Sequence, residues 1–154
     1  MKNVLKSSLA CCLVLLAGCF RGSDQEIGAQ LIKIATARDV QWAAVVAATQ
    51  SPALPFLAKI EFVAKPEFAG KTVDEALALL PKDYPYSFVF LADERALEEE
   101  GFPCYCVDLL DERRPRIRVD AKHLASVENN LTMANMDFAE FAEAAKAKGV
   151  FRGL

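Results

Sequence analysis

The chain has 154 residues, of which 18 are basic and 21 are acidic, so its formal net charge at neutral pH is −3. This length suits one domain with a buried core. A net negative protein is a poor electrostatic match for phosphate backbones, so we expect no nucleic-acid partner.

The first residues have the layout of a secretory signal peptide. Lys2 and Lys6 precede an apolar run over residues 9–17, and a basic segment followed by an apolar segment is typical of such signals. The run has about half of the roughly 20 residues that a membrane span needs, and it lacks the polar face of a core helix. We therefore predict a signal peptide over residues 1–18.

A cysteine closes this segment. The string Leu16-Ala17-Gly18-Cys19 resembles the lipobox of bacterial lipoproteins. The resemblance implies cleavage before Cys19, lipidation of Cys19 and a lipidated tether over residues 19–28. Several acyl chains hold a protein stably at a membrane, so we expect the membrane as a partner and the cell envelope as the location. Phe20 replaces the aspartate of inner-membrane retention signals, which implies the outer membrane, facing the periplasm.

Further along the chain, strand patterns alternate with helix patterns. The predicted strands cover residues 32–35, 57–63, 86–92, 104–110 and 116–119. The predicted helices cover residues 38–49, 73–80, 94–100, 120–128 and 137–148.

Strands that alternate with helices imply a mainly parallel sheet covered on both faces. We therefore predict an α/β fold, a single three-layer domain over residues 29–154 with a mainly parallel sheet of about five strands. The short charged turn between the last two strands also allows them to pair as an antiparallel hairpin at one edge.

Polar residues mark several predicted helix starts. Thr36 can cap the helix over residues 38–49, and Thr72 with Glu75 has the spacing of a capping box. Residues 69–72 also end like a phosphate-binding loop. That loop requires a glycine where this chain has Lys65, so we expect no nucleotide and no other cofactor.

The cysteines and the histidine do not form a convincing reactive or metal-binding set. Cys104 and Cys106 lie on one face of a predicted strand, and we interpret them as small buried hydrophobic residues. A strained disulfide is the alternative, because the periplasm is oxidising. Together with His123, the sole histidine, they make an incomplete zinc set. We therefore predict no metal site and assign no catalytic residue.

Two carboxylates lie where strands are predicted to end. Asp93 and Asp108 stand at the carboxyl ends of neighbouring predicted strands, where open α/β sheets bind ligands. Together they could bind a cation or perform acid–base chemistry. The alternative is that Asp93 caps a helix and Asp108 is a polar edge residue.

The densest polar stretch covers residues 128–137. Asn129 or Asn130 can end one helix in the left-handed conformation, and Asp137 with Glu140 resembles a capping box for the next. A helix end or cap does not explain Asn135 or the second asparagine of the pair. These residues either bind backbone groups of the loop or face a ligand. The candidate ligand-binding residues are therefore Asp93, Asp108, Glu128, Asn129, Asn130, Asn135 and Asp137.

Several strings are similar to those of a known family. Residues 127–131, 134–138, 140–142 and 149–153 resemble the C-terminal half of a bacterial family, domain of unknown function 6924. Upstream pieces are similar too, so the resemblance covers residues 31–154. It implies that the fold is shared and that the asparagine-rich loop matters, and it lends no catalytic residues.

Two functions follow from these observations. The first is a non-enzymatic, membrane-anchored envelope lipoprotein that binds an envelope protein partner or a small ligand. Its support is the anchor, the charge of −5 that remains without Lys2 and Lys6, and the lack of a convincing nucleophile. The alternative is an envelope hydrolase or cation-dependent enzyme that uses Asp93, Asp108 and the asparagine-rich loop. Convergence of Asp93, Asp108, Asn130 and Asn135 on one concave pocket favours an enzyme or a ligand site, whereas separate capping roles count against both.

Overall fold

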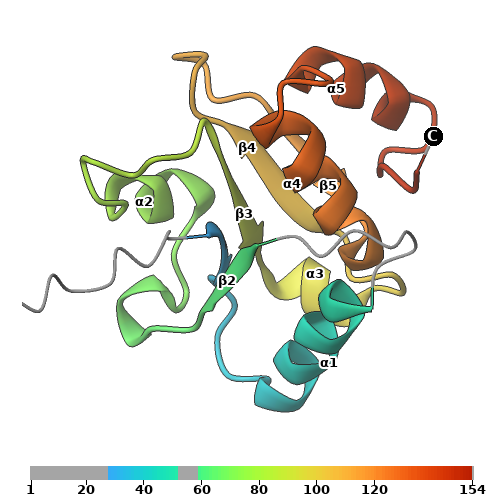
Figure 1. Ribbon diagram of the computed structural model, residues 1–154. Helices are drawn as coiled ribbons and strands as arrows, with labels where there is room; N and C mark the ends of the chain where they lie inside the picture. The colour runs from blue at the N-terminus through green and yellow to red at the C-terminus, as the bar shows by residue number, and fades with distance from the viewer. Residues whose placement is uncertain (1–27, 52–58, 154) are drawn as a thin grey trace, which may run out of the picture.

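A computed structural model describes residues 28–51 and 59–153 of the chain (Figure 1). The predicted signal peptide and Cys19 lie outside these residues. Five strands form one open sheet, as predicted, in the order β2-β1-β3-β4-β5. Their bounds are β1 (Ala29–Lys33), β2 (Ile60–Val63), β3 (Phe88–Ala92), β4 (Cys104–Asp108) and β5 (Arg116–Val119).

The sheet is mixed, so the prediction of a mainly parallel sheet is wrong. β1 is parallel to β2 and to β3, whereas β4 is antiparallel to both β3 and β5. The connection from β3 to β4, residues 93–103, holds only the five-residue helix α3 (Glu94–Glu98). A parallel crossover needs about a dozen residues or more, so this connection returns the chain in the opposite direction. The antiparallel hairpin of β4 and β5 at one edge is confirmed.

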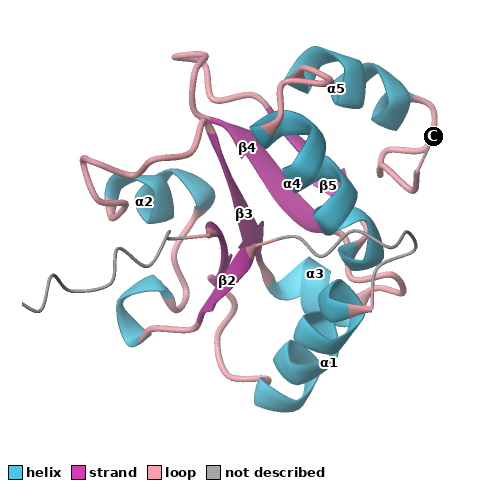
Figure 2. Cartoon of the chain, viewed as in Figure 1, coloured by secondary structure: helices cyan, strands magenta, loops and turns pink. Residues whose placement is uncertain are grey.

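Helices surround the sheet (Figure 2). In this view α2 lies to the left of β3, whereas α1, α3, α4 and α5 lie to its right. The remaining bounds are α1 (Asp39–Gln50), α2 (Val73–Ala78), α4 (Leu124–Thr132), α5 (Phe138–Lys146) and the 3-10 turns η1 (Pro66–Phe68) and η2 (Ala121–His123).

Two apolar clusters occupy opposite faces of the strands. Leu31 and Phe90 pack with residues of α1, α3, α4 and α5. Their neighbours Ile32 and Leu91 pack with residues of η1 and α2, because successive residues of a strand point to opposite faces. All five residues of β3 are buried, which confirms that the most apolar segment is a central strand.

Helix starts largely follow the predicted caps. The capping boxes at Thr72 and Asp137 are both present. Thr36, however, does not cap α1, which follows Arg38 without a side-chain cap. The backbone N–H and hydroxyl of Thr36 instead donate to the carboxylate of Glu94, at 2.7 and 2.8 Å. The loop after β1 is thereby tied to α3 rather than to its own helix.

The end of α4 differs from the prediction. α4 continues to Thr132, so Asn129 and Asn130 lie inside it, and the prediction that one of them ends the helix is wrong. Ala134 takes the left-handed conformation instead, with φ 52°. The N–H groups of Ala134 and Asn135 donate to the carbonyls of Leu131 and Asn130, which is a Schellman motif. The helix extends because Leu131 packs against the core cluster.

Candidate functional site

The structure separates the two carboxylates that we expected at one edge of the sheet. Because β3 and β4 are antiparallel, Asp108 lies opposite Phe88, at the start of β3. Asp93 follows Ala92, at the other end of the same strand. The interpretation that strand ends bring Asp93 and Asp108 together is therefore wrong, whereas the alternative, that Asp93 caps a helix, is confirmed.

Asp93 has a structural role. Its two carboxylate oxygens accept from the guanidinium of Arg118 at 2.7 and 2.6 Å, and it caps α3 by accepting from the N–H of Ala96 at 3.0 Å. Burial raises the pKa of Asp93, but the hydrogen bonds from Arg118 and Ala96 outweigh it and hold that pKa below its usual value. This carboxylate is thus fully engaged within the fold.

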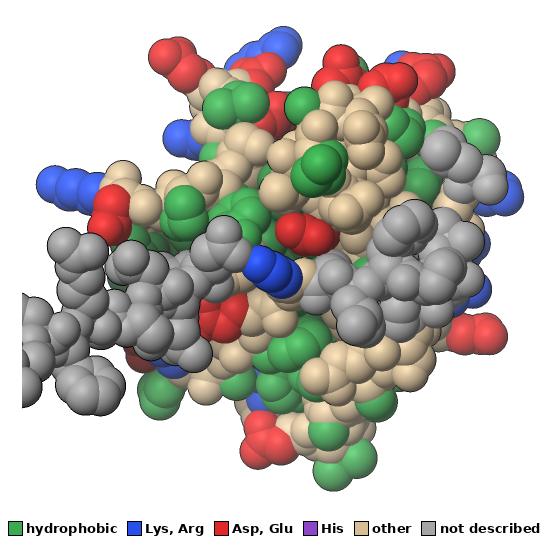
Figure 3. Space-filling view, viewed as in Figure 1, with side chains coloured by type: hydrophobic (Ala, Val, Ile, Leu, Met, Phe, Trp, Pro, Cys, Tyr) green, Lys and Arg blue, Asp and Glu red, His purple; other side chains and the backbone are tan. Residues whose placement is uncertain are grey.

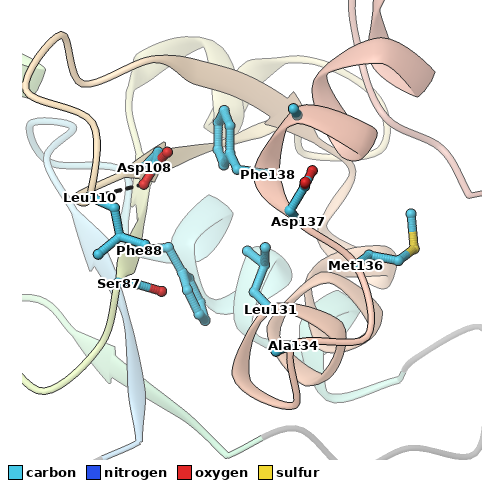
Figure 4. Close-up of a pocket in the computed structure, with 10 residues that line it drawn as sticks. Ser87, Phe88, Asp108, Leu110, Leu131, Ala134, Met136, Asp137 and Phe138 are labelled. Carbon is cyan, nitrogen blue, oxygen red and sulfur yellow. Dashed lines mark hydrogen bonds between the residues drawn. The ribbon is translucent and has the colours of Figure 1, made fainter.

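Asp108 instead lines a pocket of about 380 Å³. The pocket lies between the start of β3, the turn that joins β4 to β5, and the connection from α4 to α5. Figure 4 shows Phe88, Leu131 and Phe138 around one space, with Asp108 and Asp137 on either side of Phe138. The lining residues are Ser87, Phe88, Asp108, Leu110, Leu131, Ala134, Met136, Asp137, Phe138 and Ala139.

Asp108 and Asp137 each use one carboxylate oxygen locally. Oδ1 of Asp108 accepts from the backbone N–H of Leu110 at 2.8 Å. Oδ1 of Asp137 accepts from the N–H of Glu140 at 3.0 Å, as the cap of α5. Within residues 28–51 and 59–153, Oδ2 of neither carboxylate has a hydrogen-bond or ion-pair partner. An apolar pocket therefore carries two carboxylates that can each accept from a ligand.

The other polar residues of the 128–137 stretch do not line this pocket. The side-chain amide of Asn130 donates to the carbonyl of Ser126 at 2.8 Å, and Asn135 takes part in the Schellman motif through its backbone N–H. Glu128 is buried and accepts from the hydroxyl of Thr132 at 3.0 Å, and its burial raises its pKa. Asn129 lies within α4.

Three of the four apolar residues of the stretch reach the pocket, and sequence reasoning missed them. Leu131, Ala134 and Met136 all line it. They are interspersed with the polar residues that the sequence indicated as candidates for ligand binding. Their spacing carried no signal of a site, because the opposite wall comes from Phe88 and Leu110, on distant parts of the chain.

Cys104 and Cys106 are buried free thiols, which agrees with their interpretation as small hydrophobic residues. Burial raises the pKa of Cys104 to about 12 and raises that of Cys106 as well, so neither is a reactive thiolate. The described residues contain no group of three or more potential metal ligands. None of the helices within these ranges is long and apolar enough to cross a membrane.

A match to a protein-family model covers all the residues that the structure describes. A family model described as a domain of unknown function (DUF6924) matches residues 28–154. A search of curated proteins finds no match to the chain.

Proposed function

This chain belongs to the DUF6924 family, and we propose that it is a non-enzymatic binding module of the cell envelope. Its ligand is a segment of a partner protein that carries a basic side chain next to an apolar one. The observation that carries the proposal is the pocket in which Asp108 and Asp137 flank apolar side chains.

The chemistry of the pocket determines the kind of ligand. A carboxylate oxygen that accepts from an ammonium or guanidinium group forms a short, charge-assisted hydrogen bond. The apolar lining contributes about 25 cal/mol for each Å² of apolar surface that it takes from water. A lysine or arginine beside a leucine-like side chain satisfies both parts of the pocket, whereas an acidic ligand would be repelled.

The surface around the pocket supports a macromolecular partner. Leu110, in the pocket wall, is 80% exposed, and Met133, in the α4–α5 connection, is 65% exposed. Exposed apolar side chains beside polar ones are typical of interaction sites. Figure 3 shows acidic side chains, with a few basic ones between them, along the upper edge of the molecule, over α5 and the β4–β5 turn. Along this edge Asp111 pairs with Arg113, and Glu143 pairs with Lys146. The electrostatic complement of a basic partner segment therefore comes from Asp108 and Asp137.

The alternative function, a hydrolase or cation-dependent enzyme, depended on cooperation between Asp93, Asp108 and the asparagine-rich loop. Asp93 and Asp108 lie at opposite ends of β3, and Asp93 is paired with Arg118. Asn130 and Asn135 do not line the pocket that Asp108 lines. We therefore do not propose the enzyme.

The proposal includes a lipid anchor at Cys19, sorted to the outer membrane and facing the periplasm. Its support is the sequence, in which a basic segment, an apolar run and the lipobox-like string follow one another. The proposed domain is the three-layer arrangement predicted above, which the two apolar clusters on opposite strand faces support.

Cys19→Ala is expected to abolish lipid labelling of the chain and to release it from the membrane fraction, since the acylated residue is lost. Incorporation of labelled palmitate in growing cells measures the first effect, and fractionation measures the second. Cys12→Ala, in the same apolar segment, is the matched control and should label normally. Equal labelling of Cys19→Ala and Cys12→Ala would refute the anchor.

Asp108→Asn and Asp137→Asn are each expected to weaken binding of the peptide N-acetyl-Leu-Lys-amide about fivefold, because each removes one charge from the pocket while keeping the oxygen that accepts from the backbone. The binding is measured from amide shifts of residues 131–138 in a peptide titration of the isotope-labelled full chain in non-ionic detergent.

Glu143→Gln, on the exposed side of α5, is the matched control and should bind as the unmodified chain does. N-acetyl-Leu-Glu-amide should cause no shift at these residues. Equal shifts from the lysine and glutamate peptides would overturn the proposal, as would undiminished binding by both asparagine variants.

A further inference from the structure

We infer that a second site, at the carboxyl ends of β1 and β2, binds a small tetrahedral oxyanion such as a phosphate group. A pocket of about 200 Å³ opens there, with Lys33, Asp39 and Lys65 among its lining residues. Lys33 lies opposite Ala92 in the sheet, so this pocket is at the other end of β3 from the one that Asp108 lines. It is therefore independent of the proposed partner site.

The central feature of this pocket is the buried side chain of Lys33. Lys33 ends β1 and is 8% exposed. Its Nζ donates to Oδ1 of Asp39 at 2.7 Å, and this is its one polar partner among residues 28–51 and 59–153. A lysine ammonium has three N–H donors, and a buried charge is costly unless its donors are satisfied. The ammonium thus has donors left for another acceptor.

Asp39 shows what kind of group this ammonium binds. It is the first residue of α1, and its side chain is 93% exposed. Its carboxylate therefore reaches Lys33 from the solvent and is held by little else. Because it is exposed, this side chain can rotate away when another acceptor takes its place on Lys33. We regard the Asp39 carboxylate as an internal oxyanion. A phosphate group from solution replaces it on the Lys33 ammonium.

Two further sources of positive potential surround the same pocket. Lys65, which follows β2, is a second basic residue in the lining. The first turn of α1, a twelve-residue helix, has no side-chain cap on its N–H groups, and such a helix start favours anions. Figure 1 shows the connection from β1 to α1 descending on the lower side of the sheet. The carboxyl ends of parallel strands are a usual place for ligands in α/β sheets.

The size of the pocket limits the ligand. About 200 Å³ holds a phosphate-sized group, but it is below the range of roughly 300–1,000 Å³ typical of larger ligands. This agrees with the incomplete phosphate-binding loop at residues 69–72, which lacks the glycine that a nucleotide site requires. The site is therefore assigned to the oxyanion alone.

Titration of the full chain with inorganic phosphate, by calorimetry in non-ionic detergent and chloride buffer, tests the inference. Asp39→Ala is expected to raise the phosphate affinity about fivefold, because it removes the competing carboxylate. Lys33→Met is expected to lower the affinity at least about tenfold, because it removes the principal donor. Lys146→Met, on α5, is the matched control and should bind phosphate unchanged.

Asp39 is exposed, so its variant tests the site even if Lys33→Met fails to fold. An affinity of Asp39→Ala no higher than that of the unmodified chain overturns the inference. Unchanged phosphate binding by a folded Lys33→Met also overturns the inference. Absence of phosphate binding in both the unmodified chain and Asp39→Ala overturns it as well. Phosphatidylglycerol added to the detergent micelles competes with inorganic phosphate if a lipid headgroup supplies the oxyanion, and absence of competition assigns it to a free anion.

Discussion

Arg118→Ala is expected to lower the free energy of unfolding by about 3–5 kcal/mol, because it leaves the partners of a buried guanidinium unpaired. Arg118 is 7% exposed and binds both carboxylate oxygens of Asp93. It also donates to the carbonyl of Pro103 at 2.8 Å and lies 3.5 Å from the ring centroid of Tyr105. Equilibrium denaturation in urea, followed by the fluorescence of Trp42, measures the loss.

Arg116 provides a matched control on the same strand. Its side chain is 42% exposed, its ion pair with Asp74 spans 3.7 Å, and its guanidinium lies 5.9 Å from the Tyr105 centroid. Exposed pairs of this kind contribute about 0–1 kcal/mol, so Arg116→Ala should cost no more than that. Equal losses for the two arginine variants would show that the pair of Arg118 with Asp93 does not stabilise the fold.

The same pair gives stability a defined pH dependence. The pKa of Asp93 in the folded protein lies below its usual value, so the unfolded chain takes up the proton first. The contribution of Asp93 is therefore complete above about pH 4 and is lost as the pH falls through the pKa of the folded state. Asp93→Asn, which keeps an acceptor for the cap, should reduce the fall in stability as the pH drops below about 4.

Phe151→Ala is expected to cost about 3–5 kcal/mol, the range for a buried phenylalanine. Phe151 is 2% exposed. Its ring packs edge-on against Phe141, with centroids 5.2 Å apart, and lies 6.0 Å from the ring of His123. Its backbone N–H donates to the carbonyl of Arg118 at 2.7 Å and is retained in the variant. Thermal unfolding measures the combined loss of the ring contacts and of the backbone bridge that the docked ring holds.

Phe138→Ala is the matched control for this loss, since Phe138 is only half-buried. Its cost should be clearly smaller than that of Phe151→Ala. Hydrogen exchange at residues 116–120 should quicken in Phe151→Ala, because the bridge between Val119 and Phe151 depends on the docked ring. Equal costs for the two phenylalanine variants would mean that the C-terminal segment adds little to the core.

Features that depend on neighbouring residues could be predicted well from the sequence. The capping boxes at Thr72 and Asp137 are present as predicted, because both partners lie within one turn of helix. The burial of β3 follows from its continuous apolar run. The antiparallel hairpin of β4 and β5 follows from its short turn.

Features that depend on distant residues were predicted less well. The direction of β4 and the end of α4 both differ from the prediction, since packing decides them and local propensity does not. The sequence around Asp93 was compatible both with a helix cap and with a ligand-binding carboxylate. It became a cap with a buried partner because β5 brings Arg118 beside it.

The sequence by itself determined the element types, most caps and the lipobox-like string at Cys19, because each needs only a few consecutive residues. The tertiary structure alone decided which polar groups share a site. Asp108 and Asp137 meet across one pocket, and Lys33 meets Lys65 across another. The physical reason is that a pocket has walls from distant segments, and the direction of each strand decides which segments those are.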